Sequence, residues 1–512
     1  MTAGKRAKQV SLVMIITVFS KCLGFLRDIV LAKCFGASSV TDAYFVAQTI
    51  PESLFSLVVQ AIAIGFIPVY AQIRHDKGKD ASDAFADSVL KLALIACFFL
   101  VVIVNLFPRQ ILMVFASGFD DETAKFAMSF VRISVFAMFF RITVSVYSAY
   151  LHSNDHFVAP AFNGIVLDVV VILSIIVAFY TRSVVLVYGL VAASFLQFVM
   201  LFPVVRKHKP LMSFSGVKIN DDVKQMLLLF FPVALGVGAN QLNVIADRTM
   251  ASSIYGAISS LNYANKVDNV FENIVILSLA TVMFPAFSRS VAAKNIDELK
   301  NRVLKSINIV TFTMLPCSVL AIFFSKEIIA LLFGGGAFDA AAIEGSSAAM
   351  RYYSVGLLCL SYNAILVRVF YALKKVKLVS FISFGTLISN VLMNLLLKPL
   401  MGIGGLALAT SISNIFTTIL LVIFLSKEIN GKFLEHAIVE LFKISISSAA
   451  LLFVVYSIYS RLNFNYILSA AIASMLGMFA FLVLSHICKS STEKESYALL
   501  KARKDGKRKL GE

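Results

Sequence analysis

The sequence contains no tryptophan, few cysteines and little charge. Only 15% of its 512 residues are Asp, Glu, Lys or Arg, whereas an ordinary soluble domain has about 25%. The six cysteines are scattered without paired spacing, so neither a disulfide framework nor a metal site is indicated. Hydrophobic residues make up 59% of the chain, which points away from an ordinary soluble domain.

Apolar runs recur along almost the whole sequence. Each is about 20 residues long, enough to cross about 30 Å of hydrocarbon. They predict an all-α polytopic membrane protein with about fourteen transmembrane helices, at 10–32, 43–70, 85–107, 124–150, 158–180, 183–205, 225–250, 262–288, 303–324, 346–372, 376–397, 402–425, 437–459 and 464–487. The first run is too long, and carries too much charge, for a cleavable signal peptide, so we expect it to remain in the mature protein.

The net charge of +17 is distributed unevenly. With both ends of the chain in the cytoplasm, the inward segments hold about 29 Lys and Arg and the outward segments about 6. This bias predicts a multi-pass protein of the cytoplasmic membrane with both termini cytoplasmic. We expect the basic tail at 489–512 to be attracted to anionic membrane lipids. No nucleic-acid partner is expected, because no aromatic-basic module accompanies the tail.

The sequence repeats itself at an offset of about 220 residues. ILMVF at 111–115, with Gly118 after it, returns as IALLF at 329–333 with Gly336 after it. FGA at 35–37 corresponds in the same way to YGA at 255–257. The offset covers six helices, an even number, so the two copies have the same orientation, as in transporters with parallel repeats.

The repeat predicts the domain organisation. We expect two parallel six-helix lobes plus two C-terminal helices: an N-lobe at 1–206, a cytoplasmic linker at 207–224, a C-lobe at 225–426, the last two helices at 427–488 and the basic tail at 489–512.

The most unusual stretch is 19–70, where charges interrupt predicted spans. Lys21, Gly24 and Asp28 fall on one helical face, with Arg27 beside them. A charge within a span faces a partner or a hydrated cavity rather than lipid. Two interpretations stay open, a structural ion pair between helices and a cation-lined cavity for an anionic ligand. Cations in other spans favour the second; they include Arg132, Arg141, Arg248, Lys266, Arg351 and Arg368, although Asp168, Asp247, Asp268 and Glu272 are also present.

No catalytic constellation is visible. The six histidines lie in loops or at span ends, away from any nucleophile, and no group has metal-ligand spacing. We therefore do not expect an enzyme.

Two motifs are recognisable at this point. The first comprises SKCLGFLRD at 20–28, AKCFGA at 32–37 and TDAYFVA at 41–47, with Pro51. The second is YANK at 263–266, followed by Phe284, Pro285 and Ser288. Together they resemble signatures of the MurJ/MviN family, lipid II flippases of the multidrug/oligosaccharidyl-lipid/polysaccharide exporter superfamily. The resemblance covers about residues 9 to 425.

The resemblance implies two lobes in a V around a cationic cavity, with a groove at the last two helices for a polyprenyl tail. It implies transport of lipid II, an undecaprenyl-diphosphate-linked peptidoglycan precursor, from the inner to the outer leaflet by alternating access. A diphosphate carries about two negative charges, which cations in a low-dielectric cavity bind more strongly than in water.

The resemblance also implies site residues. The substrate-binding set is Lys21, Arg27, Asp42 and Lys266, with Gly24 and Asp28 on the same face of the first span. Lysine keeps the charge of the family's arginines but lacks their bidentate fork. Where the family has a further cavity arginine, no cation stands near Phe55.

A sodium ion is implied for some family members. Asn390, Asn394 and Thr410 match its position here, with Asn243 or Asp247 from the seventh span, although Asn394 replaces an expected acid. No other cofactor is expected, and the driving force would be this ion or the membrane potential.

Three other functions stay open from the sequence. The chain could export another polyprenyl-diphosphate oligosaccharide, such as a capsule or exopolysaccharide unit, because the cation near Phe55 is missing. A cation-coupled multidrug exporter would require a pocket richer in acids. A scaffold that contacts cell-wall synthesis enzymes would leave the charges within the spans unexplained.

Overall fold

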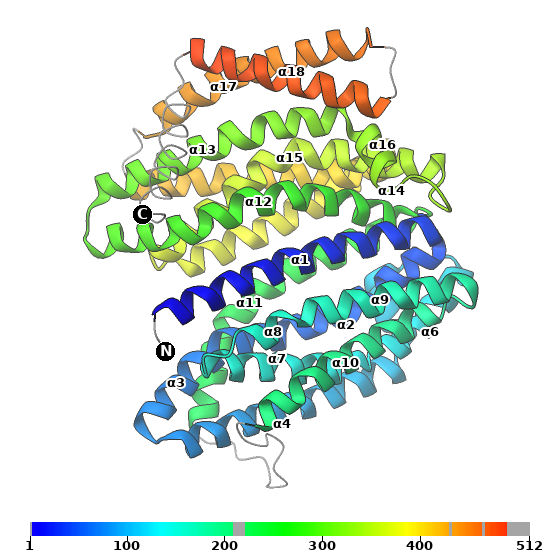
Figure 1. Cartoon of the computed structure of the whole chain (residues 1–512), viewed down its shortest axis with the longest axis vertical. Helices are drawn as coiled ribbons and strands as arrows, with labels where there is room; N and C mark the ends of the chain where they lie inside the picture. Colours follow the sequence, from blue (N-terminus) through cyan, green and yellow to red (C-terminus); the bar gives the residue numbers. More distant parts are fainter. Residues whose placement is uncertain (1–2, 208–220, 430–432, 463–465, 489–512) are drawn as a thin grey trace. The chain divides into compact units, whose positions relative to one another are not determined.

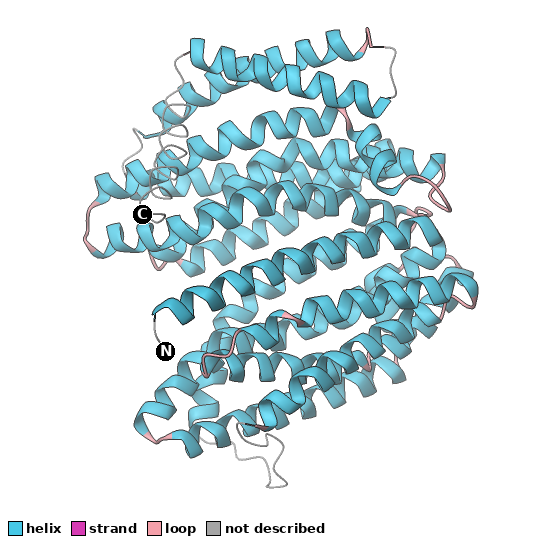
Figure 2. Cartoon of the chain, viewed as in Figure 1, coloured by secondary structure: helices cyan, strands magenta, loops and turns pink. Residues whose placement is uncertain are grey.

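The described part of the chain is helical throughout. The computed structural model describes residues 3–207, 221–429, 433–462 and 466–488, which form helices and turns without a β-strand (Figure 1, Figure 2). The all-α prediction is confirmed for these residues. Residues 208–220 of the predicted linker and the whole of the predicted tail (489–512) lie outside the described residues.

The chain forms two compact units. The first comprises Met1–Ser259 with Phe333–Ala342, and the second comprises Ser260–Leu332 with Ile343–Glu512. This division follows spatial contacts rather than the sequence repeat, so the predicted lobe boundaries stay predictions.

In the first unit, α9 packs against both α1 and α10, and α2 packs against α6 and α11. Its aromatic core includes Phe66, Tyr70, Phe85, Tyr147 and Tyr150. The helices are α1 (Ala3–Phe35), α2 (Ser39–Ala61), the π-helix η1 (Ile62–Phe66), α3 (Ile67–Asp76), α4 (Lys79–Leu106), α5 (Pro108–Ala116), α6 (Asp121–Ser134), α7 (Ala137–Ser153), α8 (Val158–Ala161), α9 (Asn163–Tyr180), α10 (Val185–Arg206) and α11 (Asp221–Ala251).

In the second unit, α17 packs against α13 and α18 around Phe324, Leu451 and Phe481. The helices are α12 (Ala257–Ala292), α13 (Ile296–Phe323), α14 (Ser325–Phe333), α15 (Ala340–Ala372), α16 (Val376–Glu428), α17 (Phe433–Tyr459) and α18 (Tyr466–Ile487). The first residues of α12 and the junction between α14 and α15 belong to the first unit.

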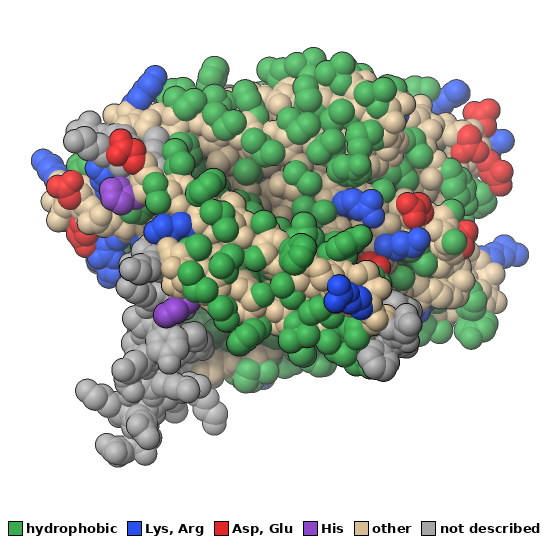
Figure 3. Space-filling model, turned by 90° about the horizontal axis from the view of Figure 1, so that it is seen from above, with side chains coloured by type: hydrophobic (Ala, Val, Ile, Leu, Met, Phe, Trp, Pro, Cys, Tyr) green, Lys and Arg blue, Asp and Glu red, His purple; other side chains and the backbone are tan. Residues whose placement is uncertain are grey.

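Many of these helices can cross a membrane. Among the described residues, eight are long and apolar enough, or nine if the bent pair α6 and α7 counts as one span. One of the eight, α16, contains two of the predicted spans and is broken at Gly402, where φ is 56°. The count of fourteen stays a prediction. Hydrophobic side chains dominate the face in Figure 3, which suits a surface covered by lipid rather than water.

Backbone turns recur at the spacing of the sequence repeat. Gly36 and Gly256, 220 positions apart, both adopt positive φ, at 64° and 67°. Asp155 and Lys374, 219 positions apart, adopt φ of 63° and 58° at helix ends. The repeated ILMVF and IALLF segments lie on α5 and α14, each nine residues long. The fold thus repeats locally where the sequence does.

Candidate functional site

Arg27 lies in a buried charged cluster on α1. Its Nη2 is 2.9 Å from Asp28 Oδ1, and its Nη1 is 3.0 Å from Asp168 Oδ1 on α9. The three side chains are 12%, 3% and 8% exposed. Two carboxylates therefore contact one guanidinium. This arrangement matches the structural ion pair between helices, one of the two interpretations that the sequence left open.

Small residues let α1 approach α9 at this cluster. A Cβ atom on Gly24 would lie 3.3 Å from Asp168 Oδ2, and one on Gly164 would lie 2.0 Å from Ser20 Oγ. The second distance is shorter than real Cβ contacts, so Gly164 cannot be enlarged without moving its neighbour. The close packing positions Asp168 within reach of Arg27.

Lys21 has different surroundings from the other residues on its predicted face. It is exposed, whereas Asp28 is buried and Gly24 faces Asp168. The structure therefore brings together Gly24, Arg27, Asp28 and Asp168 but leaves Lys21 outside the cluster. Sequence reasoning named Asp168 only as one of several acids; its position as a single carboxylate in the apolar run at 158–180 was the available signal.

Asp42 accepts hydrogen bonds from the first turn of α12. It is 2% exposed, and its Oδ1 accepts hydrogen bonds from the Ser259 backbone N–H at 2.7 Å and the Ser259 hydroxyl at 2.6 Å. A carboxylate at a helix N-terminus pairs with otherwise unsatisfied N–H groups and with the positive end of the helix dipole. Arg248 Nη1 donates to Ile258 O at 3.1 Å in the same region. Both predicted site residues thus have structural contacts at the turn between α11 and α12.

Two glycine turns from distant parts of the sequence interlock beside Lys33. The Ala337 N–H donates to Lys33 O at 2.8 Å. A Cβ on Gly36 would lie 2.3 Å from Ala337 O, and one on Gly336 would lie 2.3 Å from Lys33 O. Both distances are too short for any side chain, and both residues have positive φ. The two turns can approach this closely only because Gly36 and Gly336 have no side chain.

The repeat-related turns make a second contact of the same kind. The Gly118 N–H donates to Ser252 Oγ at 2.9 Å, and a Cβ on Gly118 would lie 2.6 Å from Ser253 N. A Cβ on Gly256 would lie 2.6 Å from Ala37 O. Turns of one repeat therefore pack against turns of the other within the first compact unit.

A second ion pair joins α2 to α7. Arg141 Nη1 is 3.0 Å from Glu52 Oε1, which also accepts from Gln48 Nε2 at 3.1 Å. The Glu52 side chain is 45% exposed although it follows Pro51 in the middle of α2. A half-exposed carboxylate at that depth needs water or a polar partner rather than lipid. Glu52 precedes Phe55 by three residues on α2, so this ion pair lies about one helical turn from the position of the missing cation.

In the second unit, the predicted cations lie on different helices. Lys266 is half-buried on α12, and Arg351 is exposed on α15, where its Nε donates to Ser325 Oγ at 3.3 Å.

The predicted sodium ligands divide between the units. Asn390, Asn394 and Thr410 lie together on α16, whereas Asp247 lies on α11 in the first unit. Asn394 Nδ2 donates to Asn390 Oδ1 at 2.8 Å, and Asn390 Nδ2 lies 3.4 Å from Thr410 Oγ1. Sodium binds through oxygen atoms, and these contacts alone do not show an ion site, so the site stays a prediction. In the described part of the chain, no three His, Cys, Asp or Glu residues gather as metal ligands.

Comparisons with known proteins give one consistent family. The model of the family described as "Lipid II flippase MurJ" matches residues 31–477. A probable lipid II flippase MurJ of Buchnera aphidicola subsp. Baizongia pistaciae is 28% identical over 485 residues, 93% of each chain. The lipid II flippase MurJ of Burkholderia cenocepacia is 27% identical over 422 residues, 80% of this chain and 82% of that one.

Solved structures agree with the family match. A lipid II flippase MurJ in an inward closed conformation superposes with a TM-score of 0.81 and 25% identity, covering 93% of this chain and 98% of that one. An inward-facing multidrug resistance transporter of the MATE family has a TM-score of 0.69 at 13% identity, covering 81% and 98%, and shares the fold alone. The motifs around Arg27 and Lys266, the helical architecture and a match that spans 31–477 lead to one conclusion: this multi-pass membrane protein belongs to the MurJ lipid II flippase family.

Proposed function

We propose that this protein moves lipid II from the inner to the outer leaflet of the cytoplasmic membrane by alternating access. The observation that carries the proposal is the family match across residues 31–477. The positive-inside bias of the loops supports an orientation with both termini in the cytoplasm. No chemical step is required of the protein, so we propose a transporter without enzymatic activity.

The diphosphate of lipid II would be the group that the cations recognise. Lys21 is exposed on α1 and would be the first cation of the first unit to meet it. Arg27 is held by Asp28 and Asp168. A bound diphosphate would compete with these carboxylates for the guanidinium, because it offers the same paired oxygens and about two negative charges. Lys266 and Arg351 stay predicted cations of the second unit.

The interlocked turns would form the barrier on the outer side. Lys33 stands among the outward segments in the positive-inside topology, and it lies in the last turn of α1, beside the Gly36 and Gly336 turns. We propose that these contacts separate when lipid II is released outward and form again afterwards. The driving force in this proposal is the membrane potential or a sodium ion, at about 2.3 kcal/mol per charge per 100 mV for the potential.

The residue at position 55 supports a second candidate substrate. Phe55 stands where the resemblance implies an arginine, and the nearby Arg141 is paired with Glu52. A different glycan on the same polyprenyl diphosphate would fit a site with this altered charge.

Complementation separates the two substrates. The gene is expressed in a strain depleted of its own lipid II flippase, with membrane levels checked by immunoblot. Restored growth is expected for the wild-type protein. Failure at normal expression would reject lipid II as the substrate, and the alternative would then be tested in a strain that lacks an exopolysaccharide flippase.

A further inference from the structure

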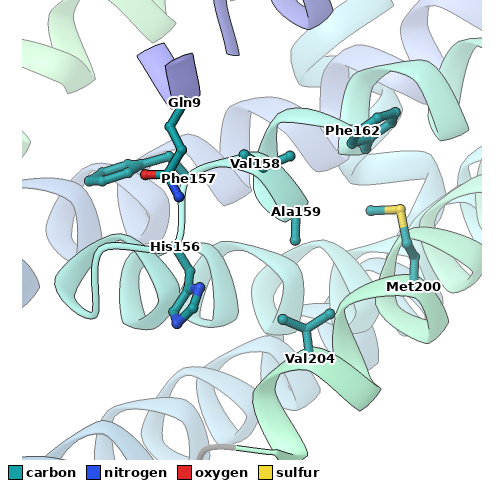
Figure 4. Close-up of a pocket in the computed structure, with 8 residues that line it drawn as sticks. All are labelled: Gln9, His156, Phe157, Val158, Ala159, Phe162, Met200 and Val204. Atoms are coloured by element: carbon teal, nitrogen blue, oxygen red, sulfur yellow. The ribbon is translucent and has the colours of Figure 1, made fainter. Parts of the chain in front are cut away.

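A cavity of about 410 Å³ lies beside the start of α1 in the first unit (Figure 4). Its volume falls within the about 300–1,000 Å³ of small-ligand sites. Most of the lining is apolar and comes from α8, α10 and the turns flanking α8: Phe157, Val158, Ala159, Phe162, Met200 and Val204. Gln9 and His156 supply the polar groups at its edge. The cavity therefore suits a chain-like apolar group with a polar end.

The cavity lies at the cytoplasmic ends of three predicted spans. Gln9 immediately precedes the span at 10–32, His156 precedes the span at 158–180, and Val204 is in the last turn of the span at 183–205. The opening exists because α7 ends at Ser153 and the chain forms only the four-residue α8 before α9 begins. A ligand here would be at the level where headgroups of the cytoplasmic leaflet meet their acyl chains.

Two cationic residues come directly after the apolar lining residues, at the C-terminal end of α10. Met200, Val204 and Lys207 fall at i, i+4 and i+7, on one face of the helix. Lys207 and the adjacent Arg206 are both exposed. The acid of the neighbouring turn, Asp155, is also exposed and does not line the cavity. An acyl chain among the apolar side chains would thus have its headgroup close to two cations.

We propose that this cavity binds an acyl chain of an anionic phospholipid of the cytoplasmic leaflet, with the headgroup phosphate beside Lys207 and Arg206. The site is separate from the residues proposed to bind the transported diphosphate. It is occupied by a resident lipid and not by cargo.

Native mass spectrometry of the purified full-length protein tests this proposal. The protein is equilibrated with phosphatidylglycerol or with phosphatidylcholine of identical acyl chains, and retained lipids are counted. Ala159→Phe fills the cavity and is expected to retain one phosphatidylglycerol fewer than wild type. Lys207→Glu, at an exposed position, is expected to weaken phosphatidylglycerol retention about fivefold or more and to leave phosphatidylcholine retention unchanged.

Two control variants match these changes. Ala192→Phe enlarges an exposed alanine elsewhere on α10, and Arg182→Glu reverses an exposed cation three residues before that helix begins. Both variants are expected to behave as wild type. Equal retention of phosphatidylglycerol by Ala159→Phe, Lys207→Glu and their controls would overturn the proposal. Displacement of the retained phosphatidylglycerol by equimolar undecaprenyl phosphate would also overturn it, by assigning the cavity to the polyprenyl chain.

Discussion

The Arg27 guanidinium lies 3.0 Å from the Asp168 carboxylate and joins α1 to α9 across 141 positions of sequence. Asp28 contacts the same guanidinium at 2.9 Å. A cation held by two acids stabilises the helix pair. In the proposed function, a bound diphosphate would compete with these acids for the guanidinium.

Removing Asp168 should weaken the α1–α9 contact. We expect Asp168→Ala to lower the free energy of unfolding by about 1.5–3 kcal/mol, the contribution of a hydrogen bond to a charged group, because Arg27 keeps only Asp28. Thermal unfolding in detergent measures the effect. Asp76→Ala removes an exposed partner of His75 and should change stability by less than about 0.5 kcal/mol. Equal shifts for the two variants would show that Asp168 has no structural role.

Two glycines with positive φ allow a controlled test of the interlocked turns, because only one of them lies in these turns. Gly36→Ala and Gly78→Ala both place a Cβ at positive φ, and Gly78 (φ 86°, ψ −179°) lies in a backbone region that is almost exclusive to glycine. A Cβ on Gly36 also meets Ala337 O at 2.3 Å, whereas one on Gly78 meets nothing within 4 Å. We expect Gly36→Ala to lower the melting temperature and the flipping rate further than Gly78→Ala. Similar values for both would mean that the turns do not meet closely.

The Asp42 carboxylate should control the first turn of α12. Asp42→Ala removes the acceptor of the Ser259 backbone N–H, while the Ser259 hydroxyl keeps Gly256 O as an acceptor at 3.1 Å. Loss of a helix cap costs about 0.5–2 kcal/mol. Hydrogen–deuterium exchange should therefore accelerate at residues 257–260. Asp297→Ala changes an exposed acid in the first turn of α13 and should leave exchange in α12 unchanged; unaltered exchange in Asp42→Ala would contradict the capping role.

The sequence predicted the all-α fold and the positions of repeated turns, because both can be read from short sequence patterns. Apolar runs identify helices whatever their neighbours are. Gly36 and Gly256 could be paired from sequence alone, and both adopt positive φ. The family could also be recognised, from the motifs around Arg27 and Lys266.

The contacts of the site residues could not be predicted in the same way. Lys21 and Asp28 share a helical face by spacing, yet one is exposed and the other buried, because burial depends on which neighbouring helix covers each turn. Asp42 was predicted as a substrate ligand, but its partner Ser259 is 217 positions away. The π-helix at Ile62–Phe66 has no sequence signal that we recognised.

Lys21 should contribute to cargo binding through its charge. We expect Lys21→Glu to weaken lipid II binding about tenfold or more, the equivalent of a charged hydrogen bond of about 1.5–3 kcal/mol, and Lys21→Arg to retain it. Binding of labelled lipid II to protein in nanodiscs gives the affinity. As a control, Lys326→Glu alters an exposed lysine whose ion pair with Glu344 is 3.8 Å long; a similar loss there would indicate nonspecific attraction rather than a site at Lys21.

Direct transport tests the central claim. Purified protein is reconstituted in liposomes, and the movement of labelled lipid II between leaflets is followed beside that of the same polyprenyl diphosphate carrying an exopolysaccharide unit. We predict that wild-type protein moves lipid II faster than the second substrate and that Lys21→Glu slows this movement. Folded wild-type protein that moves only the second substrate, or neither of them, would contradict the account.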